Sequence, residues 1–154
     1  MFELPVPAIA AQEDRARSDG TTYDLGVRPA LMLEAIRTLQ DAGVELDIWK
    51  IEGLDRREDC KRLVATARRD GCDDIGCIVL EHGADEKKVL EWLETAASVP
   101  GFIGFAVGRT TFWNAVAGYL AKQLTCQEAA ALVARRYREW AAVFEHAHAH
   151  AGAA

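Results

Sequence analysis

Apolar and polar positions along the chain form two kinds of segment, short runs typical of strands and longer segments with an apolar stripe at helical spacing. The pattern predicts strands over residues 2–8, 45–53, 75–80 and 102–107. It predicts helices over residues 28–43, 55–69, 85–99, 112–121 and 126–144, and a long polar loop over residues 12–26. This alternation of strand and helix indicates a parallel sheet with right-handed crossovers.

The predicted fold class is therefore α/β, with four parallel βα units. Two architectures fit this order, an open doubly wound sheet or a piece of a (β/α)8 barrel, and both place functional residues at the C-terminal ends of the strands. Polar residues and glycines collect at those ends. They are Glu3, Lys50, Glu52, the run Glu81-His82-Gly83 and the run Gly108-Arg109-Thr110.

A lysine stands in the middle of the apolar strand over residues 45–53. Because strand side chains alternate, Lys50 shares a face with Ile48 and Glu52, while Trp49 and Ile51 point the other way. Desolvating an ammonium group is costly, so a lysine in such a strand either reaches water from an edge or is held there for chemistry.

The segment Gly108-Arg109-Thr110-Thr111 ends a strand and opens a helix. Free amides at a helix N-terminus, a glycine that allows close approach and a guanidinium group together predict a phosphate site. Gly83 would supply a neighbouring amide. In the alternative interpretation, Arg109 pairs with a carboxylate such as Glu81, and Gly108 only permits a turn.

Lys50 beside a phosphate site predicts a Schiff base with a phosphorylated ketone or aldehyde. Glu3, on an adjacent strand, is the candidate acid and base for the proton transfers. Glu52 would hold Lys50 in place or simply form an ion pair with it. His82 is either a second proton shuttle or a solvent-facing loop residue.

The composition of the chain indicates which classes of partner it can bind. The chain has 154 residues and a net charge of -6, which predicts one domain over residues 1–145 and no nucleic-acid binding. Residues 146–154 are expected to form a flexible tail; His146 and His150 would share a helical face there, yet we predict no metal site and no cofactor. Four cysteines without metal-ligand spacing and the lack of a long apolar run predict a cytoplasmic protein outside the membrane.

Four motifs in order resemble the last four strands of class I, Schiff-base aldolases. They are Phe2-Glu3-Leu4, Trp49-Lys50-Ile51-Glu52-Gly53-Leu54, Ile78-Val79-Leu80-Glu81-His82-Gly83 and Gly104-Phe105-Ala106-Val107-Gly108-Arg109-Thr110-Thr111-Phe112-Trp113. The nearest branch is the tagatose-bisphosphate-aldolase-like group, which includes the aldolase-like domain often fused to 5-dehydro-2-deoxygluconokinase in inositol catabolism. The likeness covers nearly the whole chain.

The resemblance implies that Lys50 is the Schiff-base lysine, Glu3 the acid/base, and Gly83, Gly108 and Arg109 the phosphate-binding positions. It implies cleavage of a phosphorylated keto-sugar to dihydroxyacetone phosphate and an aldehyde. In the inositol branch the substrate would be 6-phospho-5-dehydro-2-deoxygluconate, and the aldehyde would be malonate semialdehyde.

The chain departs from this family in length, because the family has eight strands and this sequence predicts only the second four. The carboxylate and second lysine that the family brings from its earlier strands are absent. Four barrel strands alone would expose an apolar inner face. The sequence therefore predicts half of a TIM barrel, completed by dimerisation about a two-fold axis.

Three functions follow from these patterns. The first is an aldolase-like lyase that works through Lys50. The second is a catalytically inactive sugar-phosphate-binding or scaffold domain that dimerises. The third is an open flavodoxin-like sheet that serves as an interaction module, which the missing phosphate loop after the first strand makes unattractive.

Overall fold

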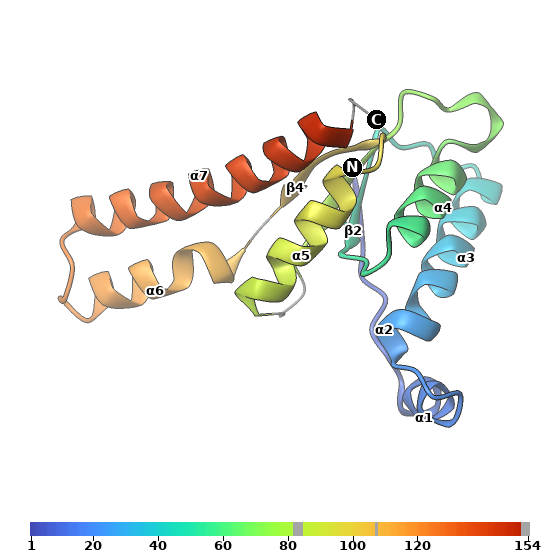
Figure 1. Cartoon of the computed structure of the whole chain (residues 1–154), viewed down its shortest axis with the longest axis horizontal. Coiled ribbons are helices and arrows are strands. Elements are labelled where there is room, and N and C mark those ends of the chain that lie inside the picture. The colour runs from blue at the N-terminus through green and yellow to red at the C-terminus, as the bar shows by residue number, and fades with distance from the viewer. Residues whose placement is uncertain (82–84, 107, 152–154) are drawn as a thin grey trace.

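A computed structural model describes residues 1–81, 85–106 and 108–151, and shows a mixed α/β fold (Figure 1). The strands are β1 (Phe2–Leu4), β2 (Ile48–Glu52), β3 (Gly76–Leu80) and β4 (Phe102–Ala106). The helices are α1 (Ala10–Ser18), α2 (Tyr23–Gly26), α3 (Arg28–Asp41), α4 (Arg57–Ala67), α5 (Glu86–Ala97), α6 (Arg109–Leu120) and α7 (Cys126–Ala151), with a short 3-10 turn at Arg69–Gly71.

The four strands form one parallel sheet in the order β1-β2-β3-β4. This confirms the predicted parallel sheet of βα units. A doubly wound sheet reverses its strand order and carries helices on both faces. Here each new strand is added on the same side of the one before it, so the order is that of consecutive units in a singly wound sheet.

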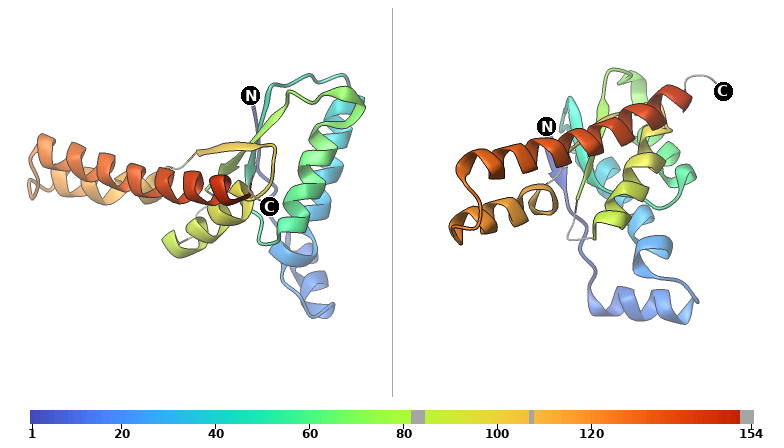
Figure 2. Two further views of the ribbon diagram at one scale, coloured as in Figure 1. Left: turned by 45° about the horizontal axis from the view of Figure 1, so that its top comes forward. Right: turned by 60° about the vertical axis from the view of Figure 1, so that its left-hand side comes forward.

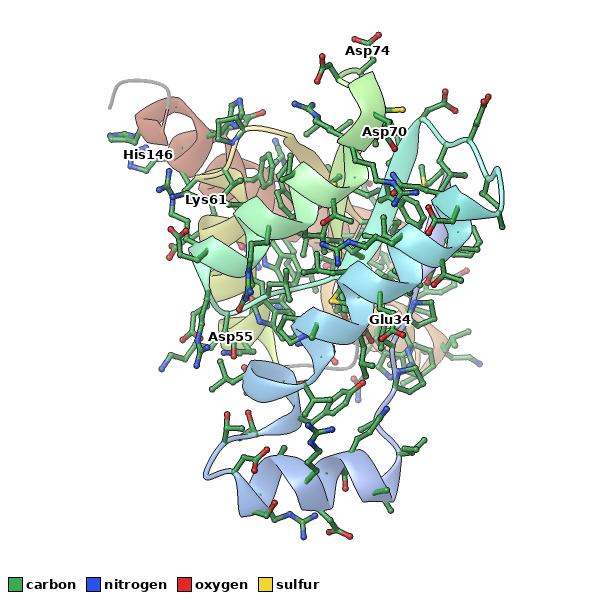
Figure 3. All side chains as sticks on the ribbon, turned by 90° about the vertical axis from the view of Figure 1, so that its right-hand side faces the viewer. Glu34, Asp55, Lys61, Asp70, Asp74 and His146 are labelled. Atoms are coloured by element: carbon green, nitrogen blue, oxygen red, sulfur yellow. The ribbon has the colours of Figure 1, made fainter. Side chains whose placement is uncertain are left out.

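The helices α3, α4, α5 and α7 bury one face of this sheet. Trp49 and Ile51 of β2 lie in a single apolar core with Met32 of α3, Leu63 of α4 and Leu93 of α5. Figure 2 shows α3 and α4 side by side against the strands. On their outer surfaces charged side chains such as Glu34 and Lys61 face water (Figure 3). The apolar stripes predicted from spacing are thus the stripes that pack on the sheet.

The opposite face of the sheet is only half-buried. Its side chains come from the alternate positions, because neighbouring parallel strands keep side chains of one row on the same face. The central row joins Glu3, Lys50, Ile78 and Gly104. An irregularity opposite Cys77 adds Ile103 to this face, where it lies over Gly76 and stays largely exposed. We call this surface the open face.

Beyond β4 the chain forms a helical hairpin that extends away from the sheet (Figure 1). The C-terminal half of α7 packs on the body of the protein through Trp140 and Phe144, while α6 packs on α7. The outer surface of α6 carries Trp113 and Leu120, whose exposed fractions are 53% and 69%.

Several predicted boundaries are wrong. Residues 12–26 are not a loop, because they contain most of α1 and all of α2. The helix predicted over residues 55–69 is α4, which begins only at Arg57, and its N-cap Arg56 makes no side-chain capping bond. The last helix does not end near residue 144 but continues to Ala151, so the predicted tail over residues 146–154 begins inside α7. In the described part of the chain, no helix is both long and apolar enough to cross a membrane.

Candidate functional site

Lys50 and Glu3 meet on the open face, as the sequence predicted for a Schiff-base lysine and its acid/base. They are direct partners in the parallel register of β1 and β2. The Nζ atom of Lys50 donates to Oε2 of Glu3 at 2.7 Å. The exposed fractions of the two side chains are 20% and 52%. The amine is therefore shielded, while the carboxylate stays in contact with water.

Space remains on the open face at Gly104, in the row that holds Lys50. A methyl group added at Gly104, in the same row, would touch only Ile78 at 3.9 Å. The half-buried side chains of Ile48 and Ile78 stand beside the amine on β2 and β3. A carbonyl group could reach the amine from this side, with Glu3 within the distance at which proton transfer occurs.

The predicted phosphate site at the start of α6 holds a carboxylate of the protein itself. Glu81, which follows β3, accepts hydrogen bonds from Gly108 N at 3.1 Å and from Thr110 N at 3.3 Å. The hydroxyl of Thr110 also donates to Glu81. Free amides at a helix N-terminus attract an anion, and here Glu81 supplies it. A substrate phosphate would have to displace this carboxylate.

The alternative role of Glu81, an ion pair with Arg109, is not found among the described residues. Glu81 binds the backbone and the threonine of the turn, while Arg109 is exposed to water. Gly83 and His82, which the sequence also proposed for this region, lie outside the described residues. Of the predicted phosphate-binding positions, Gly108 and Thr110 therefore come together around Glu81.

Arg109 makes no contact with Lys50 among the described residues. The row that holds Lys50 reaches Gly104 on β4 only across β3, which is roughly 10 Å at the usual spacing of strands. Arg109 follows Gly104 by five residues, beyond the end of β4. Lys50 and the predicted phosphate site at the start of α6 are thus about two strands apart in the described chain.

Glu52 belongs to a buried cluster that sequence reasoning did not anticipate. Its carboxylate accepts a hydrogen bond from Val6 N at 3.0 Å and lies 3.7 Å from the guanidinium of Arg28. The side chains of Glu52 and Arg28 are only 3% and 5% exposed. Arg28 also pairs with Asp24 at 3.0 Å. This arrangement holds the segment after β1 against the start of α3.

Tyr23 completes the cluster by donating its hydroxyl to Val6 O at 2.8 Å. Burial, followed by the negative charge of Glu52, raises the pKa of Tyr23. The cluster lines a cleft of about 350 Å³ beside the C-terminal ends of β1 and β2. One feature of the sequence could have indicated this cluster. Arg28 stands beside Pro29 at the start of a helix, where the preceding turn can hold a charged side chain.

A second polar cluster fixes the segment after β2. Asp55 accepts hydrogen bonds from Trp92 Nε1 at 2.6 Å and pairs with Lys88 at 2.8 Å. Burial works to raise the pKa of Asp55, but the bonds from Lys88 and Trp92 outweigh it and hold that pKa below its usual value. The indole of Trp92 also lies against Gly53, where it leaves no space for a side chain. Asp55 thus anchors α5.

A cleft of about 640 Å³ lies at the other end of the sheet. It is lined by the segments before β2 and β3, which include the carboxylates of Glu45, Asp47, Asp73 and Asp74. Ligands of parallel sheets bind at the C-terminal ends of the strands, so we place the candidate site at Lys50. Within the described residues no group of three or more His, Cys, Asp or Glu side chains could hold a metal ion.

Comparison with known proteins identifies one family. A family model described as "Uncharacterized protein conserved in bacteria (DUF2090)" matches residues 20–148. Searches of curated proteins and of solved structures found no match. The comparisons therefore give the site no established activity, and its chemistry rests on the residues.

Proposed function

The chain belongs to the DUF2090 family, and we propose from its own residues that it is an aldolase-like lyase that forms a Schiff base between Lys50 and a phosphorylated keto-sugar. The observation that carries this proposal is the contact of 2.7 Å between Lys50 Nζ and Glu3 Oε2 on the open face. It joins a nucleophile to a proton acceptor, which is the minimum that amine catalysis requires.

The proton transfers can be assigned to this pair. Glu3 accepts a proton from the Lys50 ammonium, and the neutral amine adds to the substrate carbonyl to give a carbinolamine. Glu3 then returns the proton to the hydroxyl group, which leaves as water, and an iminium ion remains. Glu3 next removes the proton of the hydroxyl group beyond the bond to be cleaved. The electrons of that carbon–carbon bond move into the iminium, an aldehyde departs, and protonation and hydrolysis of the enamine release the second product.

The half-barrel architecture is part of the proposal. Sequential strand order with helices against one face is the winding of a (β/α)8 barrel. An all-parallel sheet is normally covered on both faces, yet the open face holds half-buried Ile48, Ile78 and Leu80. We propose that a second copy of the chain covers it, so that eight strands surround the Lys50 amine.

The substrate class follows from charge at the strand ends. Arg109 is an exposed cation beside the start of α6, and the amides of Gly108 and Thr110 already hold an anion in Glu81. A phosphate group that replaced Glu81 would meet the same donors and the guanidinium. Compounds such as 6-phospho-5-dehydro-2-deoxygluconate carry the required ketone and phosphate. The cytoplasm is the setting we propose, and the four thiols are all free.

Borohydride trapping tests the proposal. The protein is incubated with phosphorylated ketoses, reduced with borohydride and analysed by peptide mass spectrometry; we expect one adduct, on Lys50. Lys50→Ala should abolish the adduct. Lys61→Ala, which removes an exposed lysine of α4, should leave it unchanged. An adduct that survives in Lys50→Ala, or no adduct with any phosphorylated ketose, refutes the lyase.

Glu3→Gln separates positioning of the amine from proton transfer. The amide keeps the size of the side chain and an oxygen that can accept from Lys50, but it is a far weaker base. Removing a general acid/base typically slows turnover by about 10² to 10⁴-fold. We expect the release of aldehyde to fall in that range while the protein keeps its fold.

A second candidate function is a catalytically inactive sugar-phosphate-binding or scaffold domain that dimerises. It is favoured by the contact of Lys50 with Glu3, because an ion pair on a covered face can be purely structural. In that case phosphorylated sugars would raise the melting temperature without leaving any adduct after reduction. Heat stabilisation together with a Lys50 adduct would exclude it.

A further inference from the structure

The chain exposes more surface than a compact monomer of its size. Its accessible surface is 9110 Å² for a mass of 16.9 kDa. A compact monomer of that mass exposes about 7,700 Å², so the excess is about 1,400 Å². A standard interface buries about 800 Å² on each partner, and obligate homodimers bury more. The excess, to which the extended hairpin of α6 and α7 contributes, is of the size that one partner loses in an obligate homodimer.

Two strand edges remain unpaired among the described residues. The sheet begins with β1 and ends with β4, and each pairs on one side only. Exposed edges invite pairing with another strand. A two-fold axis parallel to the strands would bring β1 of one copy beside β4 of the other at two places. All eight strands would then be parallel, in two identical sets of four.

A groove beside β4 suits an incoming strand. It has a volume of about 600 Å³ and is lined by residues 100–105 together with the aromatic rings of Tyr137 and Phe144 on α7. In β1, Phe2 packs edge-on against Trp49 and is only half-buried. The exposed side of Phe2 could enter this groove on the partner. The groove is mostly apolar, although Glu145 and His148 also line it, so it and the ring of Phe2 would remove apolar surface of each other from water.

Pairing of this kind would place the reacting groups of one copy beside the arginine of the other. Within one chain, β4 lies three strands from Glu3 and two from Lys50. Across the β1–β4 junction, the partner's β4 would lie one strand from Glu3 and two from Lys50. The guanidinium that follows the partner's β4 is thus nearer to Glu3 than the one in the same chain, and it lies the same number of strands from Lys50.

We propose that the site is composite, with Lys50 and Glu3 from one copy and Arg109 from the other. This inference rests on the proposed function for its chemistry, but the pairing of β1 with the partner's β4 stands independently of any reaction. Arg109 then binds the substrate phosphate across the junction. Each dimer has two such sites.

Cross-linking tests the pairing without reference to catalysis. Glu3→Cys and Ile103→Cys are combined in a chain whose exposed thiols are removed by Cys72→Ser and Cys126→Ser. Both new thiols lie on the open face. Within one chain they stand three strands apart, about 14 Å, which is beyond the reach of a short bismaleimide. We expect a covalent dimer on a denaturing gel.

The control pairs Glu3→Cys with Lys61→Cys on the outer surface of α4, and should give no covalent dimer at the same protein concentration. Sedimentation of the unaltered protein provides a second measurement that no substitution disturbs, and we expect a dimer at micromolar concentration. A monomer, or a dimer in which positions 3 and 103 do not cross-link, overturns the pairing.

Mixing of inactive variants tests the composite site. Lys50→Ala and Arg109→Ala are each expected to cleave substrate poorly when alone. After exchange of subunits in an equal mixture, half of the dimers are hybrids with one intact site, so about a quarter of the wild-type rate should return. If both groups act within one chain, nothing returns, and the composite site is refuted. If the wild-type protein itself forms no adduct, the proposed function fails while the cross-linking result still decides the pairing.

Discussion

Gly53→Ala is expected to destabilise the protein strongly, because Gly53 lies against the ring of Trp92. An added Cβ would stand 2.2, 2.3 and 2.4 Å from three ring atoms, whereas carbon atoms in contact are about 3.5–4.0 Å apart. Trp92 cannot easily retreat, since it is 5% exposed and bonded to Asp55 at 2.6 Å. Overpacking of a core costs about 1–3 kcal/mol, and the fixed ring places this case near about 3 kcal/mol.

For a domain of this length, each kcal/mol lowers the melting temperature by roughly 2–4 °C, so we expect a fall of roughly 6–12 °C. Urea and heat unfolding, followed by tryptophan fluorescence at one protein concentration, measure the change. Gly104→Ala is the matched control, because its added Cβ would meet only Ile78 at 3.9 Å. The control should shift the free energy of unfolding by no more than about 0.5 kcal/mol.

The double variant Gly53→Ala/Trp92→Phe separates the clash from other effects. Phenylalanine is smaller, so the pair should lose at least about 1 kcal/mol less than the sum of the two single changes. The reasoning is refuted if Gly53→Ala and Gly104→Ala unfold at the same urea concentration, or if the double variant loses the full sum.

Three further predictions follow from buried and capping groups. Burial raises the pKa of the Cys60 and Cys77 thiols to about 12. At pH 8 these two thiols should therefore react with a maleimide far more slowly than the exposed thiols of Cys72 and Cys126, and mass spectrometry should show two fast and two slow additions. The pKa of Asp55 is lowered in the folded protein. The contribution of Asp55 to stability is therefore fully present above its usual pKa near 3.8 and is lost as the pH falls through the lowered pKa. The difference in free energy of unfolding between wild type and Asp55→Asn should therefore be constant from pH 6 to 5 and shrink below pH 4; a difference that grows in acid would contradict this. Glu81→Ala leaves the amides at the start of α6 without their acceptor and should cost about 0.5–2 kcal/mol in urea unfolding. Glu94→Ala on α5 serves as the exposed control.

The sequence predicted β2, β3 and β4 because their apolar runs are dense enough to indicate burial, and the alternation with helices then implied the parallel sheet. It did not predict α1. That helix buries little beyond Ala16 and is supported by ion pairs such as the one between Arg17 and Glu13. A helix without an apolar stripe carries no periodic signal, so its polar residues were interpreted as a loop.

The candidate site was predictable in one part and not in another. Lys50 and Glu3 could be placed together because parallel strands in sequence order bring their side chains into one row. The role of Glu81 could not be predicted, because the sequence does not give the angle at which α6 leaves β4. That angle decides whether the amides at the start of α6 face solvent or the end of β3. The pairing of Glu52 with Arg28 depended in the same way on the unpredicted path of α1 and α2.

Glu3, the proposed acid/base, stands on the shortest strand, three residues that pair with β2 alone among the described segments. Three residues of parallel ladder provide little resistance to fraying. If a second copy of the chain pairs with the outer edge of β1, Glu3 stays in place beside Lys50 only while the two copies remain associated. Activity per molecule would then fall on dilution well before either chain unfolds, and the cell could tune turnover simply by how much of the protein it makes.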